Sequence, residues 1–218
     1  MTLRVVLERP WLTFDFGAPQ RVLSWAINQP GFVTSTQILW REVRNADLPE
    51  DLDVDDWLQK ELASMRATDA VAFLTSRDVG AFHDVTSEID GVTARCVATV
   101  GLSNAERVGA RVDRSRKDWG TINLAVHTNQ AISHGAQLEA MAIAAQARTV
   151  AVTEAGLALP SGLASGTGTD CIAIAATAGS LRYAGLHTAL GEAIGQSGLC
   201  AVSQGVAEWV KTVRREED

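Results

Sequence analysis

Apolar residues in the first third of the chain come in short segments that favour β-strands. These segments are rich in β-branched and aromatic residues, and prolines or glycines separate them. Such spacing is typical of an antiparallel meander. The strands predicted from this pattern cover residues 3–7, 11–16, 21–27 and 37–43.

The remaining apolar positions alternate between helical and strand patterns. A helix is predicted to begin after Asp53, because this residue is a good N-cap and the apolar residues that follow share one helical face. Residues 133–152 and the segment from Leu186 onward also carry helical patterns, with Gly205 as a candidate interruption and residues 214–218 as a frayed tail. Continuous apolar runs predict buried strands at residues 70–75, 92–101, 121–126 and 172–177.

These elements favour an α+β fold in which a largely antiparallel sheet packs against long, Ala-rich helices. A narrow stripe of small residues on the helix at 133–152 would let it approach the sheet closely. The charged stretch at 107–119 is expected to be an exposed excursion. No linker, repeat or low-complexity segment interrupts the pattern, so a single domain over residues 1–218 is expected.

Composition and charge narrow the function classes. The 218 residues are 46% hydrophobic and 21% charged, and 19 basic against 26 acidic residues give a net charge of −7. An acidic chain without a basic stripe argues against nucleic-acid binding. The N-terminus lacks the apolar core of a signal peptide, and no apolar run reaches the length of a membrane span. We therefore expect a cytoplasmic protein with no nucleic-acid or membrane partner.

The three cysteines, Cys96, Cys171 and Cys200, are widely separated in the sequence. They form neither a disulfide framework nor a Cys-x-x-Cys metal knuckle, so we expect buried thiols in a reducing compartment. The four histidines show no zinc-ligand spacing, and no protein-bound metal is expected.

Candidate chemistry begins in the segment from Pro160 to Asp170, which is dense in glycine, serine and threonine. Glycines free the backbone for unusual conformations, and the hydroxyl and N–H groups of such a loop suit a ligand. The segment is not a Walker loop, because no Lys-Ser/Thr follows the glycines, and a strand rather than a helix comes next. A ligand-binding loop and a tight structural turn both remain open.

A second candidate segment runs from Tyr183 to Glu192, where His187 stands near the start of the last helix. From composition and spacing alone, the sequence predicts a small-molecule site built around residues 161–170 and 183–192. Two polar turns lie at strand ends, Ser103-Asn104 and Thr121-Ile-Asn123. Their side chains can form hydrogen bonds with the backbone of the turn or with an amide group of a ligand.

Four blocks occur in order along the chain: Thr-Val-Gly-Leu-Ser-Asn at 99–104, Gly-Thr-Ile-Asn at 120–123, Ala-Ser-Gly-Thr-Gly-Thr-Asp at 164–170, and Tyr-Ala-Gly-Leu-His-Thr-Ala-Leu-Gly-Glu at 183–192. Together they resemble the adenosylcobinamide amidohydrolase family, the CbiZ-type enzymes of corrinoid salvage. The segment at 21–28 is also similar to the N-terminal region of that family, so the resemblance covers nearly the whole chain. The sequence departs from the family at Gln146-Ala147-Arg148, where a Glu-Ala-Lys-like triplet is expected.

The resemblance implies hydrolysis of the amide that joins aminopropanol to the propionate arm of the corrin ring, giving adenosylcobyric acid and 1-amino-2-propanol. The expected partner is the small-molecule corrinoid substrate, whose cobalt belongs to the substrate, and no cofactor is expected. A corrin needs apolar or aromatic surface, which the six tryptophans could partly provide. A homo-oligomer is compatible with the sequence. The competing hypothesis is a non-catalytic corrinoid-binding or trafficking protein.

For this reaction Asp170, His187 and Glu192 are the expected catalytic residues. In one route Asp170 or Glu192 activates water, backbone N–H groups at 166–169 hold the oxyanion, and His187 protonates the amine. In the other, a threonine or serine hydroxyl of the glycine-rich loop forms an acyl-enzyme. We predict that Asp170 and His187 converge on one scissile amide, which requires the chain to double back after the strand at 172–177. The expected substrate-binding residues are Ser103, Asn104, Thr121, Asn123, Ser165, Gly166, Thr167, Gly168, Thr169 and Tyr183, with Ser165, Thr167 and Thr169 as the candidate nucleophiles.

Overall fold

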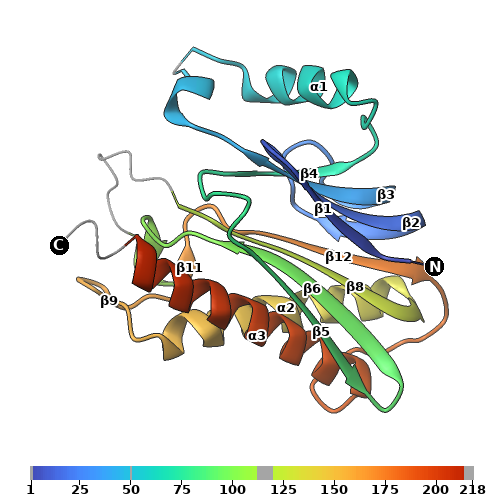
Figure 1. Ribbon diagram of the computed structural model, residues 1–218. Helices are drawn as coiled ribbons and strands as arrows, with labels where there is room; N and C mark the ends of the chain where they lie inside the picture. Colours follow the sequence, from blue (N-terminus) through green and yellow to red (C-terminus); the bar gives the residue numbers. More distant parts are fainter. Residues whose placement is uncertain (1, 50, 112–119, 214–218) are drawn as a thin grey trace.

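The computed structural model describes residues 2–49, 51–111 and 120–213 of the chain (Figure 1). Its helices are α1 (Val54–Ser64), α2 (His134–Glu154) and α3 (Ala189–Thr212), with a 3₁₀ turn η1 at Asn45–Asp47. The strands are β1 (Arg4–Glu8), β2 (Trp11–Ser24), β3 (Gly31–Glu42), β4 (Val71–Thr75), β5 (Phe82–Ile89), β6 (Val92–Val100), β7 (Ala105–Glu106), β8 (Ile122–Ile132), β9 (Ala158–Leu159), β10 (Gly162–Leu163), β11 (Gly166–Thr167) and β12 (Cys171–Ala178).

Eight strands form one sheet in the order β4-β3-β2-β12-β8-β6-β5, with β1 paired to the first half of β2. All neighbours are antiparallel except β3–β4 and β8–β12. A helix lies between the strands of each parallel pair in the sequence: α1 between β3 and β4, and α2 between β8 and β12. The predicted α+β fold with a largely antiparallel sheet is confirmed.

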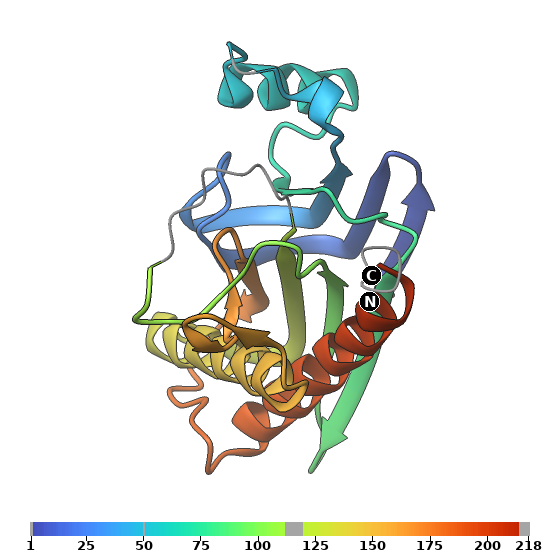
Figure 2. The same cartoon turned by 90° about the vertical axis from the view of Figure 1, so that its left-hand side faces the viewer.

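The sheet folds over, so that β2, β3 and β4 lie across one face of β12, β8 and β6 (Figures 1 and 2). Side-chain alternation along the strands explains this arrangement, because successive residues point to opposite faces. On β12, Ala173 and Ala175 join the apolar layer between the two halves of the sheet, whereas Ile172 and Ile174 pack toward α2 and α3. The first layer contains Phe14, Phe16, Ile38, Trp40, Val71 and Phe73 from the overlying strands.

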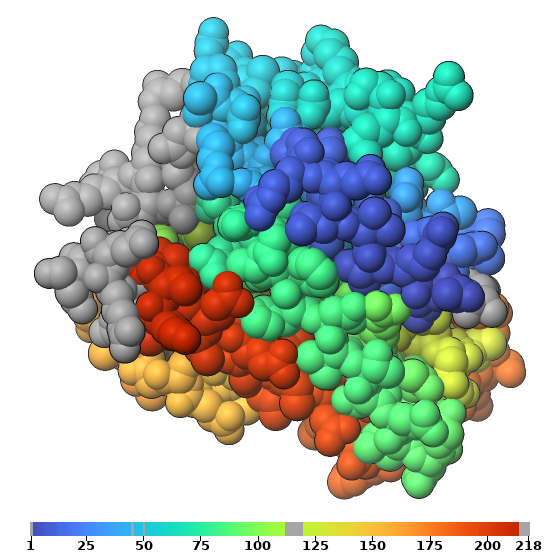
Figure 3. Space-filling model, in the orientation of Figure 1, coloured from blue at the N-terminus to red at the C-terminus, as the bar shows by residue number. Residues whose placement is uncertain are grey.

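Helix α1 covers the outer side of β3 and β4 through the fully buried Leu58 and Leu62. Asp53 caps this helix as predicted, since its carboxylate accepts a hydrogen bond from Asp56 N (3.0 Å). In the space-filling view α3 (red) lies against β5 and β6 (green), with the N-terminal strands (blue) above them (Figure 3).

Helices α2 and α3 cover the other face of the sheet, and both start where a parallel strand ends. Ser133 caps α2 and Thr188 caps α3, each by accepting a bond from a backbone N–H of the first turn. The candidate interruption at Gly205 is wrong: α3 is continuous through this residue, which is buried against Val100 of β6. A side chain there would collide with the strand, so the glycine serves close packing.

Two further differences from the predicted elements have local causes. The strands predicted at 11–16 and 21–27 are one strand, β2, whose pairing with β3 shifts between Asp15 and Gln20. Strand β5 was not predicted, because it lies at the sheet edge and its solvent side is polar. The part of the predicted excursion at 107–111 is described and Val108 is exposed, whereas 112–119 and the tail 214–218 lie outside the described residues.

Candidate functional site

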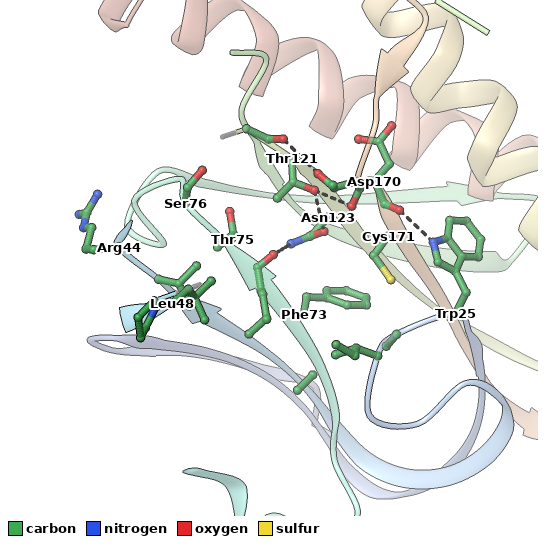
Figure 4. A pocket seen from close by; sticks show the side chains of 18 residues that line it. Trp25, Arg44, Leu48, Phe73, Thr75, Ser76, Thr121, Asn123, Asp170 and Cys171 are labelled. Carbon is green, nitrogen blue, oxygen red and sulfur yellow. Dashed lines mark hydrogen bonds between the residues drawn. The ribbon is translucent and has the colours of Figure 1, made fainter. Parts of the chain in front are cut away.

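A pocket of about 710 Å³ opens between the two halves of the folded sheet, at the end where β8 and β12 begin (Figure 4). Five separate stretches of the chain reach it, from the ends of β2, β3 and β4 and from the starts of β8 and β12. The lining residues are Trp25, Ala26, Ile27, Val43, Arg44, Leu48, Pro49, Ala72, Phe73, Leu74, Thr75, Ser76, Gly120, Thr121, Asn123, Thr169, Asp170 and Cys171.

Most of the pocket wall is apolar. Its polar side chains lie at the starts of β8 and β12, and also at the ends of β3 and β4, where Arg44, Thr75 and Ser76 line it. Trp25 and Ile27 remain about half exposed on one side of this wall. A large apolar wall with a few convergent polar groups is the usual construction of a small-molecule site.

Two side chains at the start of β8 define the polar end. The Thr121 hydroxyl donates to the Thr169 carbonyl oxygen (2.8 Å), which ties the starts of β8 and β12 together. The Asn123 amide donates to the carbonyl oxygen of Leu74 (2.8 Å), which ties β8 to the overlying β4. Both side chains line the pocket, so two of the predicted substrate-binding residues hold its two walls in place.

Asp170 lies directly before β12, and its carboxylate turns away from the pocket toward α2 (Figure 4). It forms a salt bridge with Arg148 and accepts bonds from Ile122 N (3.0 Å) and from the backbone N–H (3.0 Å) and hydroxyl of Thr167. Burial raises the pKa of the Asp170 carboxyl above its usual range, and the attraction of Arg148 acts in the opposite direction. Only the backbone side of Asp170 faces the pocket, where its carbonyl oxygen accepts a bond from the Trp25 indole (2.9 Å).

The glycine-rich loop packs behind this carboxylate. The strand β11 pairs with β7, and the Ser165 hydroxyl accepts a bond from Val108 N (2.7 Å). A side-chain carbon at Gly166 would meet the Arg148 guanidinium and lie 2.6 Å from the Asp170 carboxylate, whereas one at Gly168 would make only an ordinary contact with Glu106 at 3.8 Å. Gly166 therefore lets the Arg148–Asp170 pair close, a structural reason for one of the loop glycines.

Two more predicted residues lie beside this loop, one step from the pocket. The Asn104 amide donates to the Thr169 hydroxyl (3.3 Å), and that hydroxyl donates in turn to the Gly120 carbonyl oxygen (3.2 Å). Ser103 precedes Asn104 in a turn that contacts Gly120. Thr169 is exposed, and among the candidate nucleophiles of the loop it is the residue that lines the pocket.

The prediction that Asp170 and His187 converge is wrong. Strand β12 runs about 26 Å from the pocket end to the end where α3 begins. The chain does not double back there: Leu181 pairs beside Ile132, and Ala184 N donates to the Glu139 carboxylate near the start of α2 (2.6 Å).

His187 is exposed immediately before the cap of α3, and Glu192 is exposed in its first turn. Tyr183 is also exposed at this end of the sheet, with Arg182 over its ring. The structure thus divides the predicted site residues between two ends of β12. Those that line the pocket, Thr121, Asn123, Thr169 and Asp170, all lie at the end where the strand begins.

The titratable groups that line the pocket are few. Burial raises the pKa of the Cys171 thiol to about 12, so this sulfur is protonated at neutral pH. Arg44 stands at the rim with most of its side chain exposed and forms an ion pair with Glu42. Within residues 2–49, 51–111 and 120–213, no group of three or more His, Cys, Asp or Glu side chains could hold a metal ion. The expectation that no protein-bound metal is needed stays a prediction.

Sequence reasoning missed the half of the pocket that the overlying strands supply. The segments at 43–49 and 73–76 carry no ligand-binding motif, and only the folding of the sheet brings them opposite β8 and β12. Trp25 lies within the segment at 21–28 that resembles the family, which was the one signal available. At the family departure, Gln146 is exposed on α2 and Arg148 is the partner of Asp170.

Among the described residues, no helix is long and apolar enough to cross a membrane. A family model described as CbiZ, adenosylcobinamide amidohydrolase, matches residues 2–214. No curated protein matches the sequence significantly. Among solved structures, the chain is similar to the crystal structure of the PH0078 protein from Pyrococcus horikoshii OT3, with 10% sequence identity and a TM-score of 0.43 over 95% of this chain and 85% of that one.

Proposed function

The chain belongs to the adenosylcobinamide amidohydrolase family, and we propose that it hydrolyses the amide between aminopropanol and the propionate arm of adenosylcobinamide. The products are adenosylcobyric acid and 1-amino-2-propanol, which would return incomplete corrinoids to cobamide synthesis in the cytoplasm. The corrinoid is the substrate, and the protein uses no cofactor of its own.

The pocket between the two halves of the sheet is the observation that carries this proposal. A corrin is a broad, partly apolar macrocycle fringed with amide arms, so its site needs an extended apolar wall beside hydrogen-bonding groups. Trp25, Ile27 and Phe73 supply apolar wall, and Thr121 and Asn123 supply amide-binding groups at one end. We propose that an amide arm enters at this polar end while part of the ring lies along the wall.

Hydrolysis adds the oxygen of water to the amide carbonyl carbon and transfers protons to the departing amine, so the C–N bond breaks without any redox change. Donors near the carbonyl oxygen must stabilise the negative charge of the tetrahedral intermediate. We assign Asp170 a positioning role, because its carboxylate is engaged by Arg148, Thr167 and Ile122 and turned from the cavity. If the acyl-enzyme route operates, Thr169 is its nucleophile, since it is the candidate nucleophile of the loop that lines the pocket.

One assay tests the proposal. The purified protein is incubated with adenosylcobinamide, and free aminopropanol and adenosylcobyric acid are quantified by mass spectrometry. We expect equal amounts of both products, and a reaction in H₂¹⁸O should place one labelled oxygen in the new carboxylate. Intact-protein mass spectrometry during turnover separates the two routes, because an acyl-enzyme at Thr169 adds the mass of the cobyric acyl group.

A non-catalytic corrinoid-binding protein is the second candidate, and one observation favours it. The carboxylate of Asp170 faces away from the cavity, and His187 and Glu192 lie beyond the far end of β12. Stoichiometric binding of adenosylcobinamide with no aminopropanol released, under conditions where the protein remains folded, would establish this candidate and overturn the hydrolase.

A further inference from the structure

We propose that Trp25 is a specificity-determining residue that packs its indole ring against a flat conjugated surface of the corrinoid. The inference rests on the proposed function and adds to it the residue that recognises the apolar part of the substrate. Three features of the Trp25 side chain support this role: its exposure, its hydrogen bond to Asp170 and its position on the pocket wall.

Exposure separates Trp25 from the other tryptophans in the described part of the chain. Trp11, Trp40 and Trp209 are buried in the apolar layers. Trp57 is partly covered on α1, with the Arg41 guanidinium over its ring. Trp25 is 48% exposed and lines the pocket. A half-exposed tryptophan on a pocket wall leaves a large apolar area in contact with water, and a ligand that covers this area is favoured.

The indole ring is also held in one orientation. Its N–H donates to the Asp170 carbonyl oxygen (2.9 Å), and the Asp170 side chain is itself fixed by Arg148 and Thr167. The hydroxyl of Ser24, the preceding residue, donates to the Ile172 carbonyl oxygen (2.9 Å). Both bonds connect the Trp25 region to the start of β12, so the ring is placed before a ligand arrives and loses little conformational entropy on binding.

The same tether restricts what the ring can recognise. Its single polar group is occupied by Asp170, so the surface offered to a ligand is apolar and π-conjugated. Ile27 continues this exposed apolar wall, and Arg44 stands at the rim rather than beside the ring. The fitting ligand chemistry is therefore a flat conjugated face, which a corrinoid offers either at its macrocycle or at the adenine of its upper ligand.

The test compares Trp25→Ala and Trp25→Phe with wild type and with Trp57→Phe as a matched control outside the pocket. Kd is measured for adenosylcobinamide and for dicyanocobinamide, and kcat and KM are measured for adenosylcobinamide. We expect Trp25→Ala to raise Kd and KM by roughly 5- to 100-fold, the range of one aromatic stacking contact, with kcat nearly unchanged. Trp25→Phe keeps a ring but loses the hydrogen bond to Asp170, so its Kd should lie between those of wild type and Trp25→Ala. The Kd of Trp57→Phe should equal that of wild type.

The two ligands identify the stacked surface: a loss for both indicates the macrocycle, and a loss confined to adenosylcobinamide indicates the adenine. An unchanged Kd for Trp25→Ala, or a loss of kcat alone, overturns the inference, because Trp25 would then only support Asp170. If Trp25→Ala does not fold, Trp25→Phe and Trp25→Leu give the same comparison. Wild type that neither binds nor cleaves a corrinoid overturns the proposed function instead.

Discussion

The two ends of β12 carry the two polar segments that the sequence predicts as one site, and the structure gives them different surroundings. Before the strand, the Asp170 carboxylate is buried and bonded to two other segments of the chain, α2 and the start of β8, and to Thr167 of its own loop. After the strand, His187 and Glu192 are exposed and flank the cap of α3. Similar residue types therefore have a packed scaffold at one end and solvent at the other.

The difference follows from how parallel strands connect. Helices α2 and α3 follow β8 and β12, so both helix starts lie at the end of the sheet where these strands finish. The pocket lies at the opposite end, where the strands begin and the overlying β4 reaches β8 through Asn123. A motif adjacent in sequence to the pocket can thus be separated from it by the full length of a strand.

The largest expected effect is the loss of the charge at the pocket end. Asp170→Asn should destabilise the protein by about 3–5 kcal/mol, because it leaves the Arg148 guanidinium largely buried without its counter-charge and turns an amide donor toward other donors. Urea unfolding followed by circular dichroism measures this change. The exposed pair of Asp56 and Lys60 on α1 is the control, and Asp56→Asn should cause no measurable loss. Equal stability of the two variants would contradict this expectation, because the buried and the exposed carboxylate would then contribute equally to stability.

The strand beside β12 provides the next test, because it carries a buried histidine between the two ends. Burial, with a smaller contribution from Arg95, lowers the pKa of His127 to about 4. In the unfolded chain His127 binds a proton below about pH 6.5, whereas in the folded protein it binds one only below about pH 4. The free energy of unfolding therefore decreases as the pH falls from 6.5 to 4. We expect this loss to total roughly 3 kcal/mol.

The measurement is the free energy of unfolding at several pH values for wild type and for His127→Gln. The free energy of unfolding of His127→Gln should change less between pH 6.5 and pH 4 than that of wild type, whatever its value at pH 7. An equally steep profile for His127→Gln would mean that carboxylates cause the acid sensitivity.

Two glycines of the same loop give a smaller and sharper comparison. Gly166→Ala should cost about 1–3 kcal/mol, because the new methyl group meets the Arg148–Asp170 pair. Gly168→Ala should change stability by less than about 0.5 kcal/mol, since the nearest atom to its new side chain is 3.8 Å away. Thermal unfolding of both variants measures the two losses of stability. Equal losses would show that the loop is not packed more tightly at Gly166 than at Gly168.

The elements that follow from local rules could be predicted from the sequence, and those that depend on long-range folding could not. The cap at Asp53 and the apolar strand at 70–75 are set by a few neighbouring residues, and both are confirmed. Strand β5 was missed because an edge strand with one polar side lacks a continuous apolar run. The partner of Asp170 was missed because Arg148 lies 22 positions away on a helix, and only the packing of α2 on the sheet brings the two together.

The candidate site divides in the same way. Thr121, Asn123 and Thr169 were predicted from strand ends and loop composition, and they lie at the pocket. The opposite wall, including Phe73, comes from a strand that crosses over the sheet, which no local pattern encodes. Asp170 and His187 do not meet because the chain after β12 stays at the end of the sheet where β8 and β12 finish, and α3 begins there.

The smallest expected effects are at the α3 end, and they decide which end holds the active site. His187→Ala and Glu192→Ala remove exposed side chains outside the pocket, so kcat and KM for adenosylcobinamide should remain within about 2-fold of wild type. Thr121→Val is the matched change at the pocket end: it keeps the shape, removes the hydroxyl bonded to the Thr169 carbonyl oxygen, and should lower kcat/KM by roughly 10-fold. If His187→Ala instead loses about 100-fold in kcat while remaining folded, the chemistry belongs at the start of α3, and the pocket end only binds.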